Sequence, residues 1–146
     1  MENTIFNADD IYVLDNERLA ELKRIALAHP LRRSRVCLHH SRDSGVQEMV
    51  IVAHRDSLIE AHRHPANKPE SYHILEGSML VRIFDNDGGV LREIALNDHA
   101  NPKMYRIAGG IWHQPIPLTE WVVYHEVFTG PFLKETDVIY SNWSQL

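Results

Sequence analysis

Residues 58–77 read LIEAHRHPANKPESYHILEG, and they combine an apolar strand pattern with three side chains of metal-binding type. His62 and His64 are two residues apart, so in a strand both imidazoles point to the same side. If residues 65–69 loop the chain back, Glu70 enters on the neighbouring strand and faces the same cavity. The stretch therefore predicts two imidazoles and a carboxylate inside a β-structure.

A third histidine comes from much later in the chain. Residues 109–113 read GGIWH, which places His113 at the head of another expected strand. Three neutral imidazole nitrogens and one carboxylate suit Fe(II), Mn(II), Ni(II), Co(II), Cu(II) or Zn(II), and ligand type alone does not choose among these ions. We therefore expect one divalent transition metal, bound by His62, His64, Glu70 and His113.

Other interpretations of these side chains remain open at this point. An isolated His-x-His pair is also typical of surface or capping histidines at a strand end. Glu70 is alternatively a loop carboxylate paired with Arg63 or Lys68, and His113 is alternatively a histidine packed beside Trp112. The order and spacing of the whole set favour the metal site.

The pattern around this stretch predicts one helix followed by many strands. Residues 15–29 carry apolar side chains at helical spacing, with Asp15 as the N-cap and Pro30 just past the end. From Ser34 onward, short β-rich runs alternate with turn residues, and residues 85–89 (DNDGG) favour a hairpin. Roughly eight to ten short strands predict an all-β sandwich or barrel. The clearest runs are 36–40, 47–54, 72–75, 79–84, 90–94, 105–107, 113–117 and 121–128.

We divide the chain into three parts on this basis. Residues 1–33 form an N-terminal segment with the amphipathic helix, and residues 34–130 form the barrel. Residues 131–146 form a C-terminal arm that lies on the barrel or on a partner subunit. The apolar side chains of this arm argue against a free tail: Val138, Ile139, Tyr140 and Trp143.

Composition limits the classes of partner. The chain has 146 residues and a formal net charge of -5, and its Lys and Arg residues form no stripe of the kind that nucleic acid requires. Cys37 is the only cysteine, so no intrachain disulfide forms. The first ten residues do not read as a signal peptide, and no apolar run approaches the roughly 18 residues of a membrane span. We expect a cytoplasmic protein that binds neither nucleic acid nor membrane.

The histidine motifs carry a family resemblance. The two cupin motifs run approximately G-x5-H-x-H-x3-4-E-x6-G and P-x-G-x2-H. This sequence is similar in His62-x-His64, in Glu70-x6-Gly77 and in Gly110-x2-His113. It departs from the motifs in the five residues between His64 and Glu70, at the leading glycine and at Ala108. The resemblance implies a cupin-type double-stranded β-helix, or jelly-roll barrel, with a bound metal.

A narrower resemblance covers roughly residues 30–132. The runs 35–39 (RVCLH), 47–49 (QEM) and 62–65 (HRHP), with Glu126 before 130–131 (GP), look like the WbuC family of cupin-fold metalloproteins. That likeness implies a setting in surface-polysaccharide (O-antigen) assembly. It implies no particular reaction.

Strand alternation also predicts a polar pocket wall. Arg35, Cys37 and His39 share one strand face, and Gln47 faces the same way from the next strand if both faces line the interior. We expect Arg35, Gln47 and Glu126 to contact a substrate, although an internal hydrogen-bond network with Glu126 or Tyr124 would satisfy the same groups. Cys37 fits a small buried residue better than a nucleophile.

The leading functional hypothesis is a metal-dependent isomerase or epimerase for a small polar molecule, such as a sugar or nucleotide-sugar. Tyr72 and His39 are the candidate proton carriers, and a packing role for Tyr72 is the alternative. Two other functions stay open, namely an Fe(II)-dependent dioxygenase and a non-catalytic binding module for a small molecule. We also expect a homodimer, because the apolar arm offers a contact for a second copy.

Overall fold

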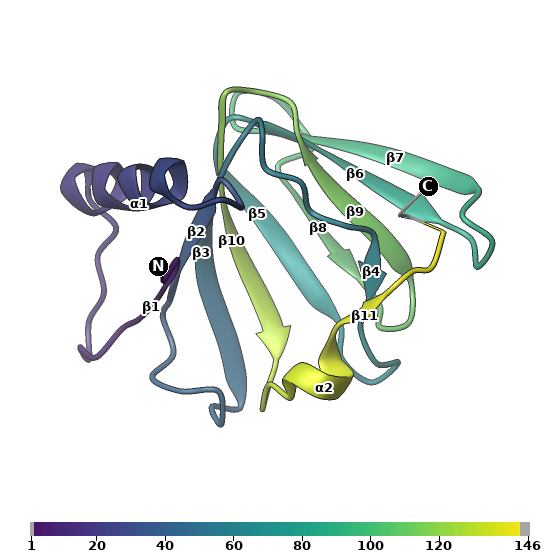
Figure 1. Cartoon of the computed structure of the whole chain (residues 1–146), viewed down its shortest axis with the longest axis horizontal. Coiled ribbons are helices and arrows are strands. Elements are labelled where there is room, and N and C mark those ends of the chain that lie inside the picture. Colours follow the sequence, from purple (N-terminus) through teal and green to yellow (C-terminus); the bar gives the residue numbers. More distant parts are fainter. Residues whose placement is uncertain (1, 144–146) are drawn as a thin grey trace.

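The structure is a computed structural model that describes residues 2–143, and it consists of two β-sheets packed face to face with one helix outside (Figure 1). Residue 1 of the expected N-terminal segment and residues 144–146 of the expected arm lie outside the described residues. The first sheet has the order β1 (Thr4–Phe6), β2 (Arg33–Cys37), β3 (Val46–His54), β10 (Trp121–Thr129), β5 (Glu70–Glu76) and β8 (Met104–Ile107). The second has the order β11 (Ile139–Tyr140), β4 (His62–Arg63), β9 (Trp112–Pro117), β6 (Ser78–Phe84) and β7 (Val90–Asn97).

The strand order is that of a jelly roll. Strand β10 lies between β3 and β5, and β9 lies between β4 and β6, so neighbours in each sheet come from distant parts of the chain. The chain crosses from one sheet to the other at each step from β3 to β6. The predicted all-β fold with an N-terminal helix is confirmed.

Helix α1 (Asn16–Ala28) covers the outside of the first sheet. The Asp15 carboxylate caps it by accepting a hydrogen bond from the Arg18 N–H at 2.9 Å. Its buried Leu22 packs against Val36, Val50 and other outward-facing residues of β2, β3 and β10. Strand β1 pairs in parallel with β2 and was not predicted.

Strand alternation places the opposite faces of the same strands inside the barrel. The interior cluster contains apolar and aromatic side chains from both sheets. Its larger members are Met49, Ile51, Tyr72, Ile74, Met79, Leu96, Tyr105 and Tyr124. Polar side chains of the same parity, such as Arg35 and Glu126, therefore face the interior as well.

Tight turns join the strands where the sequence predicts them. The predicted hairpin joins β6 to β7, and the Gly89 N–H donates to the Asp85 carboxylate at 2.8 Å. Gly77 turns the chain from β5 into β6 with φ of 82°, and a Cβ there would collide with the Trp121 carbonyl. Only glycine fits this turn.

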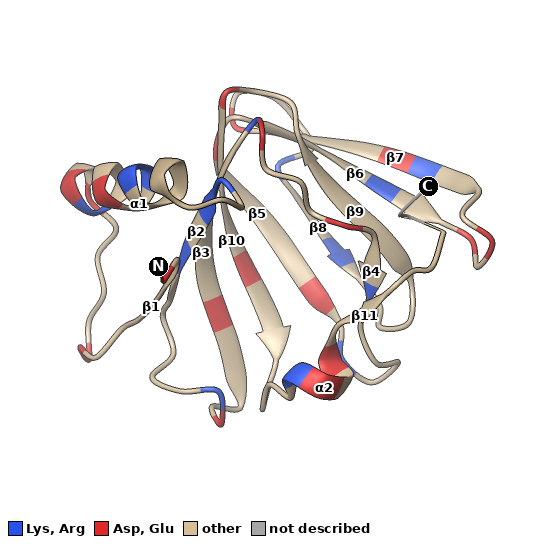
Figure 2. Cartoon of the chain, in the orientation of Figure 1, with Lys and Arg blue, Asp and Glu red and all other residues tan. Residues whose placement is uncertain are grey.

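The C-terminal arm lies against the second sheet. Short helix α2 (Lys134–Asp137) leads into β11, which pairs antiparallel with β4. Trp143 then contacts Phe84, with ring centroids 4.8 Å apart. In Figure 2 acidic and basic positions are interspersed over both sheets and the helices. No helix among residues 2–143 is long and apolar enough to cross a membrane.

Candidate metal centre

The structure brings the four proposed ligands together inside the barrel. His62, His64, Glu70 and His113 each offer one ligand atom, these atoms lie within 4.8 Å of one another, and all four residues are buried. His62 and His113 are cross-strand partners on β4 and β9, and His64 follows β4 directly. The expectation that Glu70 lies on the neighbouring strand is wrong. Residues 65–69 carry the chain across to the first sheet, and Glu70 faces the histidines from there.

Backbone contacts hold the two histidine segments in register. The Gly110 N–H donates to the His64 carbonyl at 2.8 Å. Gly109 lies against the Pro65 carbonyl with no room for a Cβ atom. The GGIWH segment can therefore pass close enough to the His-x-His segment to place His113 opposite His62.

In each imidazole the Nδ1 atom lies at hydrogen-bond distance from a backbone carbonyl oxygen. The distances are 2.8 Å from His62 to the Glu60 oxygen, 2.6 Å from His64 to the Asp137 oxygen and 2.9 Å from His113 to the Ile111 oxygen. A carbonyl only accepts, so Nδ1 must carry the hydrogen in each ring. In the neutral form all three Nε2 atoms then keep a free lone pair, which is the arrangement found around metal-bound histidines.

The Glu70 carboxylate sits among these lone pairs. Its Oε2 atom lies 3.0 Å from His64 Nε2, and its Oε1 atom lies 2.6 Å from His113 Nε2. Within the described chain these four buried atoms make no aligned hydrogen bond. Lone pairs facing lone pairs at such distances need a proton or a cation between them, so the donor set fits a metal ion.

Ring positions agree with a common ion. The centroids of the three imidazoles lie 4.5, 5.2 and 5.5 Å apart. Rings whose Nε2 atoms bind one ion at about 2.1 Å, with angles of roughly 90–115° between them, give centroid separations in this range. The three histidines therefore surround one point.

Burial controls the protonation of the site. It lowers the pKa of His62 to about 3, with help from the neighbouring His113. Burial alone would raise the pKa of Glu70, but contacts with His113 and His64 outweigh it and hold that pKa well below its usual range. For His64 burial lowers the pKa, yet the contacts with Glu70 and the Asp137 carbonyl raise it overall. A neutral His62 and an ionised Glu70 are already in their metal-binding forms.

Tyr72 and Glu126 lie beside the centre on the first sheet. They are cross-strand partners, and the Tyr72 ring lies 6.4 Å from that of His113. Burial and the charges of Glu70 and Glu126 raise the pKa of Tyr72 far above 10. Burial and the charge of Glu70 also raise the pKa of Glu126. Both groups therefore hold protons next to the candidate metal site, and their catalytic or substrate-binding roles stay predictions.

The remaining predicted site residues line a separate pocket at the edge of the first sheet, where Arg35, His39 and Gln47 occur together. The Gln47 amide nitrogen donates to three carbonyls of the loop before β3, at 2.8 Å for Ser44, so this group supports the loop. His39 contacts the backbone of Glu48 through Nδ1 at 3.0 Å. The structure thus separates His39 from the metal-ligand cluster, whereas Tyr72 adjoins it.

Two residues that contribute to the metal centre or to the outer pocket, Asp137 and Arg42, were not predicted from the sequence. The Asp137 carbonyl orients His64, and a backbone oxygen leaves no motif in the sequence. The Asp137 carboxylate is itself buried, and it accepts from Lys68 Nζ at 2.6 Å and from the Leu133 N–H at 2.9 Å. Arg42, on the loop between β2 and β3, lines the outer pocket together with Arg35.

Comparison with solved structures shows the same architecture. The capsular polysaccharide assembling protein CapF from Staphylococcus aureus matches with a TM-score of 0.63 and 17% identity, over 74% of this chain and 30% of that one. An oxalate oxidase in complex with the substrate analogue glycolate matches with a TM-score of 0.59 and 14% identity, over 77% of this chain and 57% of that one. An oxalate decarboxylase of Bacillus subtilis matches with a TM-score of 0.57 and 17% identity, over 74% and 27%.

The chain therefore has a cupin-type jelly-roll fold, and it spans well under two thirds of each of these structures. No curated protein matches the sequence. One family model does match, over residues 14–96, and its description is a domain of unknown function, DUF6016. Because this match covers more than half of the sequence, the chain belongs to the DUF6016 family.

Proposed function

We propose that this protein is a metal-dependent enzyme that acts on a small polar molecule such as a sugar or nucleotide-sugar. The observation that carries the proposal is the convergence of three imidazole Nε2 atoms and the Glu70 carboxylate at one buried point. Such a donor set holds one divalent ion, and four protein ligands on an octahedral ion leave about two positions for substrate or water.

The structural neighbours support the kind of substrate. CapF is named for assembling capsular polysaccharide, and the oxalate oxidase and decarboxylase act on a small dicarboxylate. The resemblance to the WbuC family adds surface-polysaccharide assembly to the proposal. At these identities the likeness supports the fold, and the substrate class is our inference.

We favour isomerisation or epimerisation as the reaction. A bound divalent ion supplies Lewis acidity, which stabilises negative charge as it develops on a substrate oxygen. In such a reaction a proton leaves the carbon beside a carbonyl and returns to the same or the neighbouring carbon, so no external oxidant is consumed. In this proposal Tyr72 and Glu126, whose pKa values are both raised, donate a proton to a substrate oxygen.

The metal assignment is tested by elemental analysis of the purified chain. We expect His62→Ala and His113→Ala each to lose most bound metal, because every imidazole supplies a separate ligand. His99→Ala is the matched control, since the His99 side chain is 71% exposed and outside the cluster. Full metal occupancy in folded His62→Ala and His113→Ala protein would contradict the assignment.

The reaction class is tested in heavy water with aldose and ketose substrates. Incorporation of deuterium at the carbon beside the carbonyl, dependent on metal, supports proton transfer. Oxygen uptake without deuterium incorporation would support the second candidate, an Fe(II)-dependent dioxygenase, which the same donor set also suits. Tight binding of sugars with neither reaction would indicate a binding module instead.

A further inference from the structure

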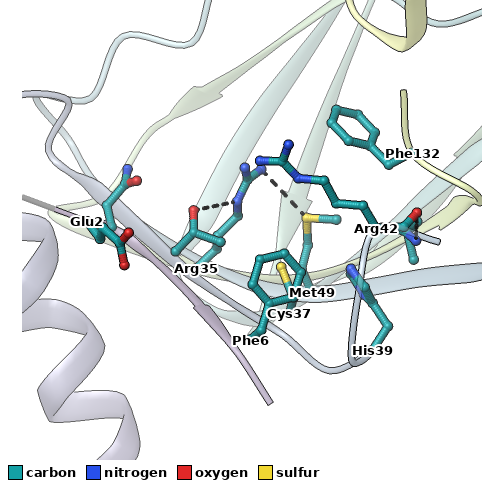
Figure 3. Close-up of a pocket in the computed structure, with 11 residues that line it drawn as sticks. Glu2, Phe6, Arg35, Cys37, His39, Arg42, Met49 and Phe132 are labelled. Atoms are coloured by element: carbon teal, nitrogen blue, oxygen red, sulfur yellow. Dashed lines mark hydrogen bonds between the residues drawn. The ribbon is translucent and has the colours of Figure 1, made fainter. Parts of the chain in front are cut away.

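A pocket lies at the edge of the first sheet, outside the metal-ligand cluster (Figure 3). Its volume is about 390 Å³, within the usual range for small-molecule sites. Phe6, Cys37, Met49 and Phe132 give it an apolar lining. Because Phe132 belongs to the C-terminal arm, the arm closes one side of the pocket.

Two arginine side chains extend into this pocket from different elements. Arg35 comes from β2 and Arg42 from the loop between β2 and β3, where Figure 2 shows basic positions. In Figure 3 both guanidinium groups point toward the middle of the pocket. His39 adds a third nitrogen base to the same lining.

Neither arginine is held in an ion pair within residues 2–143, although Glu2 also lines the pocket and Arg35 interacts electrostatically with Glu126. Arg35 donates only to the Thr4 hydroxyl at 3.1 Å and to the Met49 sulfur at 4.0 Å. The Arg42 guanidinium makes no hydrogen bond to any described residue. Within residues 2–143 neither guanidinium has a carboxylate at ion-pair distance. Two guanidinium groups with free donors in one pocket match the geometry of a bound carboxylate or phosphate.

We propose that Arg35 and Arg42 bind an anionic group, a phosphate or a carboxylate, of a small molecule that occupies this pocket. This inference goes beyond the proposed function, because it concerns a second site apart from the metal centre. It makes Arg42 an anion-binding residue that the sequence did not indicate.

A row of side chains on the interior face of the first sheet lies between the pocket and the metal centre. Cys37, Met49, Glu126 and Tyr72 are successive cross-strand partners on β2, β3, β10 and β5. Three strand spacings of about 4.8 Å separate β2 from β5, and Arg35 is in the same cross-strand row as Ile74, four residues along β5 from Glu70. The backbones at Arg35 and Glu70 are therefore roughly 20 Å apart, and the pocket is a site of its own.

The test measures binding of inorganic phosphate and of D-glucuronate by calorimetry at constant ionic strength. Arg35→Met and Arg42→Met should each weaken binding roughly tenfold, as expected for loss of one charge-assisted contact in a partly exposed pocket. Arg106→Met is the matched control, because Arg106 is exposed on β8, away from the pocket. Binding of phosphate but not glucuronate identifies a phosphate ester as the ligand of the pocket, and the reverse identifies a carboxylate.

Two controls separate this inference from the proposed function. Metal content should be unchanged in Arg35→Met and Arg42→Met, and both exposed substitutions should leave the melting temperature near that of the wild type. Anion binding is measured on metal-free protein as well, so a chain that retains no metal refutes the proposed function without affecting the pocket measurement. Absence of binding by both anions, or binding that both arginine variants retain in full, would overturn the inference.

Discussion

Replacing Lys68 with methionine should weaken metal binding without touching a ligand. Lys68 Nζ lies 2.6 Å from the Asp137 carboxylate and 2.6 Å from the Pro131 carbonyl, and its side chain is 11% exposed. Lys68→Met leaves the Asp137 carboxylate, which is 2% exposed, without its cation. The same residue supplies the carbonyl that accepts from His64 Nδ1. Loss of the Lys68–Asp137 ion pair should therefore weaken the hydrogen bond from His64 Nδ1 to the Asp137 carbonyl, which orients His64 as a metal ligand.

The magnitude follows from two steps. Breaking a buried ion pair by removing one partner costs about 3 kcal/mol at the lower end of the usual range, so the docked fraction of the arm should fall roughly a hundredfold relative to the undocked one. Loss of the hydrogen-bond partner of a metal-bound histidine typically weakens metal affinity about 10- to 100-fold. We expect a weakening of metal affinity in that range and faster amide exchange in residues 131–143.

The assay is competition with a chelating dye, combined with hydrogen exchange. Lys103→Met is the matched control, because Lys103 is exposed and lies outside the arm. The double variant Lys68→Met/Asp137→Asn removes both charges and should recover part of the affinity, since no unpaired carboxylate remains. Unchanged metal affinity in Lys68→Met, together with faster exchange in the arm, would refute the idea that the Asp137 carbonyl orients His64.

Four further changes test the fold and the centre. Gly109→Ala should lower stability by about 1–3 kcal/mol and reduce metal content, because its Cβ would meet the Pro65 carbonyl, whereas Gly45→Ala has open space and should change neither. Asp15→Ala should cost about 1 kcal/mol of unfolding free energy by calorimetry and leave metal content unchanged. Burial opposes ionisation of Asp137, but Lys68 holds the pKa of Asp137 below the usual 3.8. The stability that the Lys68–Asp137 ion pair contributes is therefore complete above pH 3.8 and is lost as pH falls through the lowered pKa. Amide exchange in the arm should rise only under such acid conditions. Adding metal at a hundred times its dissociation constant should stabilise the chelator-treated protein by about 2.7 kcal/mol, measured as a rise in melting temperature.

Much of the fold was accessible from the sequence because its signals are local. The alternation in residues 47–54 and 121–128 predicts strands, and the structure has β3 and β10 there. Alternation also predicts that Arg35 and Cys37 face one way and Val36 the other, and the structure shows this separation. Strand β1 was not predicted because three residues are too few to show an alternating pattern, and it pairs in parallel with a strand about thirty positions later.

In the candidate site, too, the features set by local pattern were predicted and those set by the overall topology were not. Parity alone places His62 and His64 together, but no local pattern says which sheet receives Glu70. The outcome depends on how residues 65–69 cross the barrel, which is a property of the whole topology. The position of Arg42 likewise depends on a loop that the buried Gln47 amide holds from inside. Contacts made by backbone oxygens, such as that of Asp137, are set by docking of the arm and have no side-chain signature.

The centre joins three parts of the molecule, the two sheets and the C-terminal arm. His62 and His113 belong to the second sheet, Glu70 belongs to the first, and His64 is oriented by the C-terminal arm. Without a cation, the Glu70 carboxylate and the Nε2 atoms beside it need a shared proton, and burial keeps His62 neutral. An ion at this point satisfies all four atoms at once and ties both sheets to the arm. Metal binding and closure of the barrel are therefore one coupled equilibrium, in which loosening the arm weakens the metal and removing the metal loosens the contact between the sheets.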